Sequence, residues 1–317
     1  MSTATRPARS PRDVSVWPHR LAVVTACATF PLLFIGGLVT SKGAGLAVPD
    51  WPTTFGNNMF LYPWSKMVGG IFYEHSHRLF GSVVGLLTIF LTLTFCFKEP
   101  RAWLRWLGVV ALVMVIIQGV LGGLRVVLLE HTLAIVHASF AQAYFALTVS
   151  LALFTSQEWR AEGNEPQIDD GGRLRRLCVI TTGLIYCQII FGAVLRHTGE
   201  RLDAHLLFAA LVMLHVLLVI LRVTRVHSQR AALVRPASLL GFLLLLQLLL
   251  GVGSYFGKFT TMLRLPIEAV VAVTTTHLII GALMLITSLI LALRSHRLST
   301  PGKTVTGQRI LTEQASI

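Results

Sequence analysis

Four histidines lie at matching places in a strongly apolar chain. Every second hydrophobic segment carries one of them near its beginning: His77, His137, His205 and His277. An imidazole surrounded by hydrocarbon is costly, so it needs a hydrogen-bond partner, an aqueous cavity or a metal. A hydrogen bond between helices would explain any one of these residues alone, but four in register indicate one shared ligand.

The neighbours of the histidines indicate the kind of ligand. Neutral imidazole binds zinc and copper, but such sites usually add cysteine or carboxylate ligands, whereas apolar and small residues surround these four. Haem fits better, because the porphyrin supplies four nitrogen ligands and a large apolar surface. We therefore predict that His77 with His137, and His205 with His277, each clamp one iron axially.

The elements that must position these residues are membrane helices. Of the 317 residues, 54% are hydrophobic and only 13% are charged, and a membrane span needs about 20 apolar residues. Apolar runs of that length lie near 21–40, 75–97, 106–124, 132–154, 177–195, 203–221, 237–256 and 269–293. The sequence thus predicts an all-α integral membrane protein with eight transmembrane helices.

The basic residues predict which side of the membrane each loop faces. Nineteen of the 27 Lys and Arg fall in the N-terminus, in three alternate loops and in the tail. The positive-inside rule makes this face cytoplasmic, so we expect a multi-pass protein of the cell inner (cytoplasmic) membrane with both termini in the cytoplasm. The net charge of +13 is therefore explained without nucleic acid.

The first apolar run and the four cysteines indicate which processing and cross-links to expect. The first apolar run lacks a small-residue cleavage signature, so we interpret it as a retained helix and not as a signal peptide. Cys27, Cys96, Cys178 and Cys187 form no C-x-x-C-H motif and no pair in an external loop. We expect neither a disulfide nor a c-type haem.

A polar linker divides the chain into two halves that resemble each other. A Gln-x-x-x-Gly pattern recurs at Gln118, Gln188 and Gln247, each in an odd-numbered segment, and the first segment carries glycines without the glutamine. The glycines suit close helix packing or the admission of a flat macrocycle. The predicted regions are an N-terminus (1–20), an N-terminal four-helix bundle (21–155), a linker (156–176), a C-terminal four-helix bundle (177–293) and a tail (294–317).

Charged residues at the outer helix ends are the other candidates for chemistry. Glu74 precedes His77 by three residues and shares its helix face, where it could act as a general base or cap the helix. Arg78, Arg125 and Arg196 could bind haem propionates, which are carboxylates, or could snorkel to the interface. The aromatic residues of the loop 41–73 could shield the outer mouth of the N-terminal bundle or anchor it at the interface.

These motifs together resemble the haem A synthase family. The resemblance rests on Glu74-His75-Ser76-His77-Arg78, on Pro49-Asp50-Trp51-Pro52 in the first external loop, on 188–197 and on the later histidines, and it covers nearly all of 21–293. It implies two pseudosymmetric four-helix bundles and an oxidoreductase that converts the C8 methyl of haem O to the formyl of haem A, through a hydroxymethyl species, for an aa3-type cytochrome oxidase.

The resemblance also implies roles for the residues. His205 and His277 would hold a haem b cofactor, while His77 and His137 would serve the half in which the substrate haem O is oxidised, with Glu74 as the catalytic carboxylate. Relatives often carry a cysteine pair in an external loop, which 41–73 lacks. Expected partners are membrane lipid, haem O synthase and oxidase assembly factors, and homo-oligomerisation stays open.

Two other functions fit the same four histidines. A di-haem b electron carrier to or from quinone would need neither Glu74 nor an opening for a substrate. A haem transporter would need an accessible path across the bilayer, whereas all four histidines lie toward one side. Product analysis distinguishes the three, because only the synthase changes the chemistry of haem O.

Overall fold

The computed structural model describes residues 15–161, 170, 172–262 and 264–299. The helices are α1 (Trp17–Ser41), α2 (Gly70–Lys98), α3 (Ala102–Leu128), α4 (His131–Thr155), α5 (Gln157–Ala161), α6 (Arg173–Thr198), α7 (Leu202–Val226), α8 (Ala231–Phe259) and α9 (Ile267–Ser299), with a short 3-10 turn at Trp64–Lys66. Most of the predicted N-terminus and tail, and the middle of the predicted linker, lie outside the described residues. The described part is helical and contains no named strand.

Eight of these helices, α1 to α4 and α6 to α9, are long and apolar enough to cross a membrane. This confirms the predicted all-α membrane fold. The helices extend past the predicted apolar runs, so that α2 already begins at Gly70 and α9 continues to Ser299. Hydropathy marks only the part of a helix within the hydrocarbon core, while backbone hydrogen bonds continue into the polar interface.

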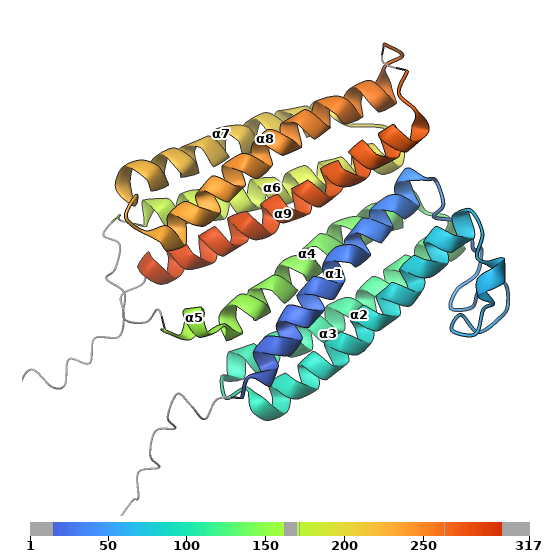
Figure 1. Cartoon of the computed structure of the whole chain (residues 1–317), viewed down its shortest axis with the longest axis horizontal. Coiled ribbons are helices and arrows are strands. Elements are labelled where there is room, and N and C mark those ends of the chain that lie inside the picture. Colours follow the sequence, from blue (N-terminus) through green and yellow to red (C-terminus); the bar gives the residue numbers. More distant parts are fainter. Residues whose placement is uncertain (1–14, 162–169, 171, 263, 300–317) are drawn as a thin grey trace, which may run out of the picture.

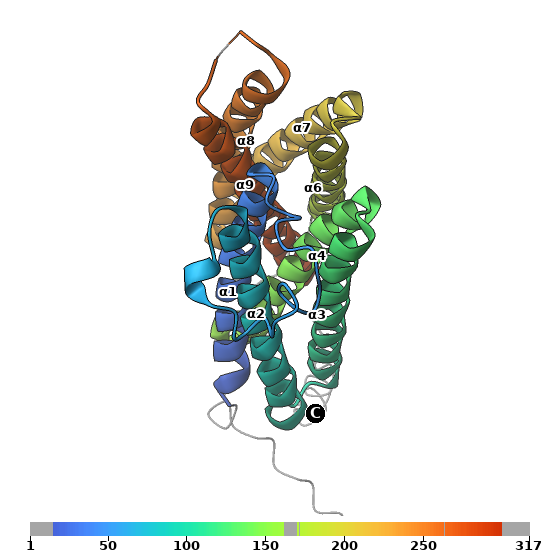
Figure 2. The same cartoon turned by 90° about the vertical axis from the view of Figure 1, so that its right-hand side faces the viewer.

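The eight spans are grouped in two sets of four. Within the first set, α1 packs on α2 and α4, and α3 packs on the same two helices; α6 to α9 repeat this ring of neighbours. Figures 1 and 2 both show α1–α4 gathered apart from α6–α9. The neighbour pattern is therefore the same in the two halves, whereas their pseudosymmetry stays a prediction.

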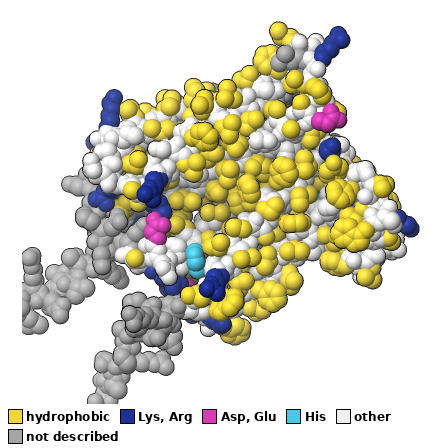
Figure 3. All heavy atoms as spheres, viewed as in Figure 1, with side chains coloured by type: hydrophobic (Ala, Val, Ile, Leu, Met, Phe, Trp, Pro, Cys, Tyr) yellow, Lys and Arg dark blue, Asp and Glu magenta, His cyan; other side chains and the backbone are white. Residues whose placement is uncertain are grey.

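The seam between the halves is formed by α1 and α4 on one side and α6 and α9 on the other. Because α9 contacts helices of both halves, it is the most buried of the spans. The outward side chains are largely apolar, and Figure 3 shows them covering the visible face between charged groups near its ends. An apolar exterior of this kind suits a lipid environment. We call the end at which α1 begins and α9 ends the inner end, and the opposite end the outer end.

Candidate functional site

Each of the four histidines faces a glycine on the preceding span. A Cβ atom added at Gly36 of α1 would lie 2.9 Å from Cε1 of His77 on α2, and one at Gly122 of α3 would lie 2.9 Å from Cε1 of His137 on α4. The same contact recurs in the second half, at 3.3 Å from Gly192 to His205 and 3.2 Å from Gly251 to His277. The glycines therefore make the room that each imidazole occupies.

The structure brings the four histidines together as two pairs. The ring centres of His77 and His137 lie 6.5 Å apart, and those of His205 and His277 lie 6.4 Å apart. Two imidazoles that share one metal through bonds of about 2 Å have ring centres on the order of 6 Å apart. The predicted pairing is thus the pairing that the helices produce, and its spacing suits one axially held iron.

The surroundings of the pairs also fit such a group. The Nδ1 atom of all four imidazoles is buried, and none has a hydrogen-bond partner within the described residues. Buried polar atoms are rarely left without a partner, so these rings are suited to a ligand. Each pair offers two nitrogen donors, which matches the two axial positions of a haem iron, whereas a zinc site takes four ligands. The described residues contain no cluster of three or more His, Cys, Asp or Glu placed to hold a metal ion.

Three glutamines contact the histidines, and the sequence analysis had given them no role. The Nε2 atoms of Gln118, Gln188 and Gln247 lie 3.4, 3.3 and 3.4 Å from Nε2 of His137, His205 and His277 respectively. Each glutamine stands one helical turn before the glycine that faces the same histidine. The repeated Gln-x-x-x-Gly spacing was the signal, because residues four apart share a helix face. Helix α1 has Leu32 at the equivalent position.

A buried ion pair lies beside the first histidine pair. Glu74 is 4% exposed; its Oε1 accepts a hydrogen bond from Nη2 of Arg78 at 2.9 Å, and its Oε2 accepts one from the backbone N–H of Val48 at 2.9 Å. Because α2 begins at Gly70, Glu74 lies inside the helix and binds the outer loop. The alternative that it caps the helix is therefore wrong.

Arg78 binds the same loop. Its two Nη atoms also donate to the carbonyl oxygens of Val48 at 3.0 Å, Asp50 at 2.7 Å and Thr53 at 3.1 Å. With Glu74 these bonds occupy all four Nη hydrogens, so a propionate could bind there only through Nε or by displacing the loop. Arg78 positions the loop in this structure, and its contact with a propionate stays a prediction.

The outer loop lies over the outer end of the first bundle (Figure 2). The Trp51 ring packs on Gly123 of α3, where an added Cβ would lie 2.2 Å from Cδ2, and Thr54 hydrogen-bonds Nδ1 of the buried His75 at 3.1 Å. The side chains at its tip, by contrast, are exposed, with Phe60 at 66% and Trp64 at 75%. The loop therefore combines a covering part with an apolar tip that suits interfacial anchoring.

Asp50 holds the turn at the start of this covering part. Its carboxylate accepts hydrogen bonds from the Thr53 hydroxyl and from the backbone N–H groups of Phe55 and Gly56, the latter two at 2.8 Å. Burial raises the pKa of Asp50, but these hydrogen bonds outweigh burial and hold the pKa below its ordinary value of 3.8. The charged carboxylate thus stabilises the loop at neutral pH.

The two other predicted propionate ligands have different surroundings. Arg125 of α3 donates from Nη2 to the Gly45 carbonyl at 3.2 Å, which leaves most of its donors without a partner in the described part of the chain. Arg196 of α6 crosses the seam and donates to Ser41, to the Gly37 carbonyl at 2.7 Å and to the Thr274 carbonyl at 3.4 Å. Arg125 is therefore better suited than Arg196 to bind an anionic ligand.

Comparisons with known proteins show what the chain is similar to. The sequence profile described as "Cytochrome oxidase assembly protein" matches residues 19–204, more than half of the chain. A protein named "Heme A synthase" from Shouchella clausii (strain KSM-K16) is 28% identical over 186 residues, which are 58% of this chain and 60% of the relative. Another "Heme A synthase", from Exiguobacterium sibiricum, is 30% identical over 189 residues, 57% and 61% of the two chains. The matched part of the chain thus spans about three fifths of the length of these relatives.

Proposed function

The chain belongs to the cytochrome oxidase assembly protein family, and from this membership we propose that it is a haem A synthase, which oxidises the C8 methyl group of haem O to a formyl group. The similarity to two proteins named "Heme A synthase" supports the proposal. The observation that carries it is the pair of facing histidines in each half, with Nδ1 atoms buried and glycines opposite.

The two histidine pairs receive different roles in this proposal. His205 and His277 would hold a resident haem b, which would supply electron transfer when bound. His77 and His137 would hold the substrate haem O in the first half. The apolar residues around both pairs suit a flat, apolar macrocycle, and the facing glycines make room for the imidazoles that would hold it.

The residues around the first pair suit the handling of a reacting methyl group. Its conversion to a formyl group, through a hydroxymethyl species and a hydrated aldehyde, takes one oxygen atom from water and releases four protons and four electrons. The electrons must pass to an external electron acceptor, for which the resident haem b would be the relay, and the protons must leave the reacting carbon or its oxygen. Glu74 is a buried carboxylate one helical turn from His77 and is held by Arg78 and Val48. We assign to Glu74 the acceptance of a proton and the positioning of a water. Arg78 orients this carboxylate, and the loop excludes bulk water from the site.

The placement of the protein in the cell is also part of the proposal. The eight spans agree with a multi-pass membrane protein, and the basic residues of the inner loops favour a cytoplasmic position for the inner end. Both histidine pairs then lie toward the outer surface of the cytoplasmic membrane. Haem O synthase and oxidase assembly factors are the partners expected to supply the substrate and receive the product.

Analysis of the bound haems tests the proposal. The full chain is purified from cells with and without haem O synthase, and its haems are separated chromatographically after acid extraction. We expect haem b alone without the synthase, and haem b with haem A or hydroxylated haem O when the synthase is present. Haem b alone in both preparations would contradict the proposal and favour the di-haem electron carrier.

A further inference from the structure

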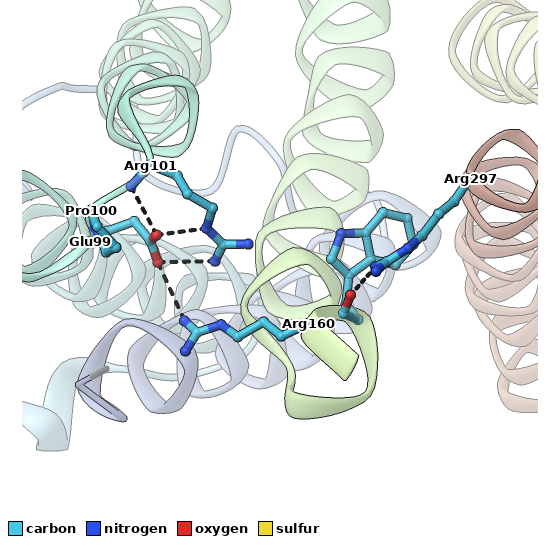
Figure 4. A pocket seen from close by; sticks show the side chains of 6 residues that line it. Glu99, Pro100, Arg101, Arg160 and Arg297 are labelled. Carbon is cyan, nitrogen blue, oxygen red and sulfur yellow. Dashed lines mark hydrogen bonds and ion pairs between the residues drawn. The ribbon is translucent and has the colours of Figure 1, made fainter. Parts of the chain in front are cut away.

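A pocket lined by charged and aromatic side chains lies at the inner end, at the opposite end of the spans from the histidine pairs, and has no part in the proposed function. Its volume is about 350 Å³, and it is formed where the α2–α3 connection, α5 and the end of α9 meet (Figure 4). The lining residues are Glu99, Pro100, Arg101, Trp159, Arg160 and Arg297. Since α9 belongs to the second half, the pocket bridges the two halves at the seam.

The pocket carries an excess of positive charge. Arg101 donates to both oxygens of Glu99 at 2.7 and 3.1 Å, and Arg160 donates to the same carboxylate at 3.5 Å. Burial raises the pKa of Glu99, but the hydrogen bonds from Arg101 and the charges of both arginines outweigh burial and lower it. Glu99 therefore stays ionised at neutral pH, and one negative charge stands against three guanidinium groups.

The guanidinium groups keep donors for a further acceptor. Each carries five N–H groups; among the described residues, protein acceptors take three from Arg101 and one each from Arg160 and Arg297. The side chains of Arg101 and Arg160 are 27% and 28% exposed, whereas that of Glu99 is fully buried. An anion that enters the pocket would thus meet arginines, with the one carboxylate behind them.

Aromatic rings place the pocket at the depth of a membrane interface. The rings of Trp103 and Phe154 lie 5.1 Å apart, and those of Phe154 and Trp159 lie 5.2 Å apart. Arg101 lies 5.8 Å from the ring centre of Trp103, and Arg297 lies 4.6 Å from that of Trp159. Trp103 is 47% exposed on the outside of the bundle, and tryptophan is enriched where membrane meets water. The pocket therefore opens at the level of lipid headgroups.

We propose that this pocket binds the phosphate of an anionic membrane phospholipid and so joins the inner ends of the two halves. Forked arginine donors bind phosphate strongly, and basic pockets between membrane helices on the cytoplasmic side are suited to anionic headgroups. A free phosphate offers the same oxygens. The position at the interface beside an exposed tryptophan favours the lipid, whose acyl chains can lie along the apolar helices.

The test measures thermal unfolding of the full chain in phosphatidylcholine micelles during titration with short-chain phosphatidylglycerol. We expect a saturable rise in Tm for the unaltered chain. Since each basic residue near an anionic surface contributes about fivefold in affinity, the Arg160→Gln, Arg297→Gln double variant should bind roughly thirtyfold more weakly. A double variant with lysine at both positions should keep much of the affinity, provided that both variants elute as the unaltered chain does on size exclusion.

Two controls identify the source of the phosphate and the specificity of the site. Arg225→Gln removes an exposed charge at the inner end of α7, outside the pocket, and should leave the titration unchanged. Inorganic phosphate at the same concentrations should leave Tm unchanged. An equal response to inorganic phosphate would overturn the lipid assignment. An unaltered affinity in the glutamine double variant, or an equal loss in Arg225→Gln, would overturn the site itself.

Discussion

The two halves share one frame for holding a pair of imidazoles but differ in what surrounds it. In both halves the pair spans about the same distance, 6.5 and 6.4 Å between ring centres, and each imidazole faces a glycine. Among the described residues, a buried acid one turn before a paired histidine occurs only in the first half: the residues three before His205 and His277 are Leu202 and Thr274, where α2 has Glu74. Only the first half is covered by a long loop, 42–69, whereas α8 and α9 are joined by 260–266.

This difference agrees with the different roles proposed for the two histidine pairs. A resident cofactor needs ligands, and the second half offers a pair of histidines without a buried acid one turn before either of them. A substrate that must enter, react and leave needs in addition a proton acceptor and a cover that can be displaced. The first half also lacks one of the glutamines that contact the other histidines. The equivalent position on α1, near His77, is Leu32. The following predictions test whether the two halves differ in this way.

The largest effect is expected from Glu74→Gln. The amide keeps the shape of the side chain but cannot accept a proton at neutral pH, and general base catalysis typically contributes about 10²–10⁴-fold. We expect the rate of haem A formation to fall by at least about a hundredfold while both haems stay bound. Product is quantified by chromatography, and haem content by absorbance.

Asp203→Asn is the matched control in the other half. Asp203 lies two residues before His205, and its side chain is 80% exposed beside Arg201. Its loss should leave the rate unchanged. Glu74→Gln protein that makes haem A at the normal rate with both haems bound would show that the carboxylate serves only to hold the loop.

Removal of single histidines should show which pair holds haem b. In cells without haem O synthase, His277→Ala should lose bound haem b, whereas His137→Ala should retain it, if the second pair holds the cofactor as proposed. Since even residues that support a metal ligand contribute about 10- to 100-fold to metal affinity, the loss should be at least about tenfold. Equal loss of haem b in both variants would contradict the assignment of the halves.

Much of this arrangement could be predicted from the sequence, because it depends on properties local to the chain. Apolar runs identified eight spans, and the alternation of histidine-bearing segments identified His77, His137, His205 and His277 as two pairs. Both follow from counting along the chain. The ring distances confirm that neighbouring hairpins bring the predicted partners together.

What the sequence did not reveal depends on the rotation of helices and on the path of the loop. Whether Gln118 reaches His137 depends on how α3 turns against α4, and nothing in the spacing alone fixes that contact. The sequence offers a propionate or the membrane interface as the partner of Arg78, and does not reveal that its donors bind carbonyl groups of a loop whose course depends on many weak contacts. The helices are also longer than the predicted apolar runs, because hydropathy identifies the part of a helix in the membrane core and not its terminal turns.

The glycine contacts predict a graded effect of added methyl groups. Gly122→Ala would place Cβ 2.9 Å from the His137 ring, closer than side chains normally approach, whereas Gly192→Ala would place it 3.3 Å from His205. Overpacking costs at least about 1 kcal/mol, so we expect about fivefold weaker haem binding in the first variant and a smaller change in the second. Haem occupancy after detergent dilution measures both, and equal losses would show that the two pockets are equally tight.

The smallest effect concerns the cover that the first half alone possesses. Asp50→Asn removes the charge that accepts the hydrogen bonds of the loop but keeps a neutral oxygen that can still accept. Because Asp50 is half-buried, we expect a loss of about 0.5–1 kcal/mol, within the range of one net hydrogen bond. Trypsin should therefore cleave about two- to fivefold faster after Lys66, an exposed residue of the loop, and at an unchanged rate after Arg264, which is exposed in the short loop of the second half. Because hydrogen bonds hold the folded-state pKa of Asp50 below 3.8, its stabilisation is complete above that pH and is lost as the pH falls through the lowered pKa. Pepsin cleavage of the unaltered loop should therefore rise below pH 3.8, while the asparagine variant loses this part of the pH dependence. Equal acceleration at Lys66 and Arg264 would show a general loosening of the outer end, and the two halves would then not differ in how they are covered.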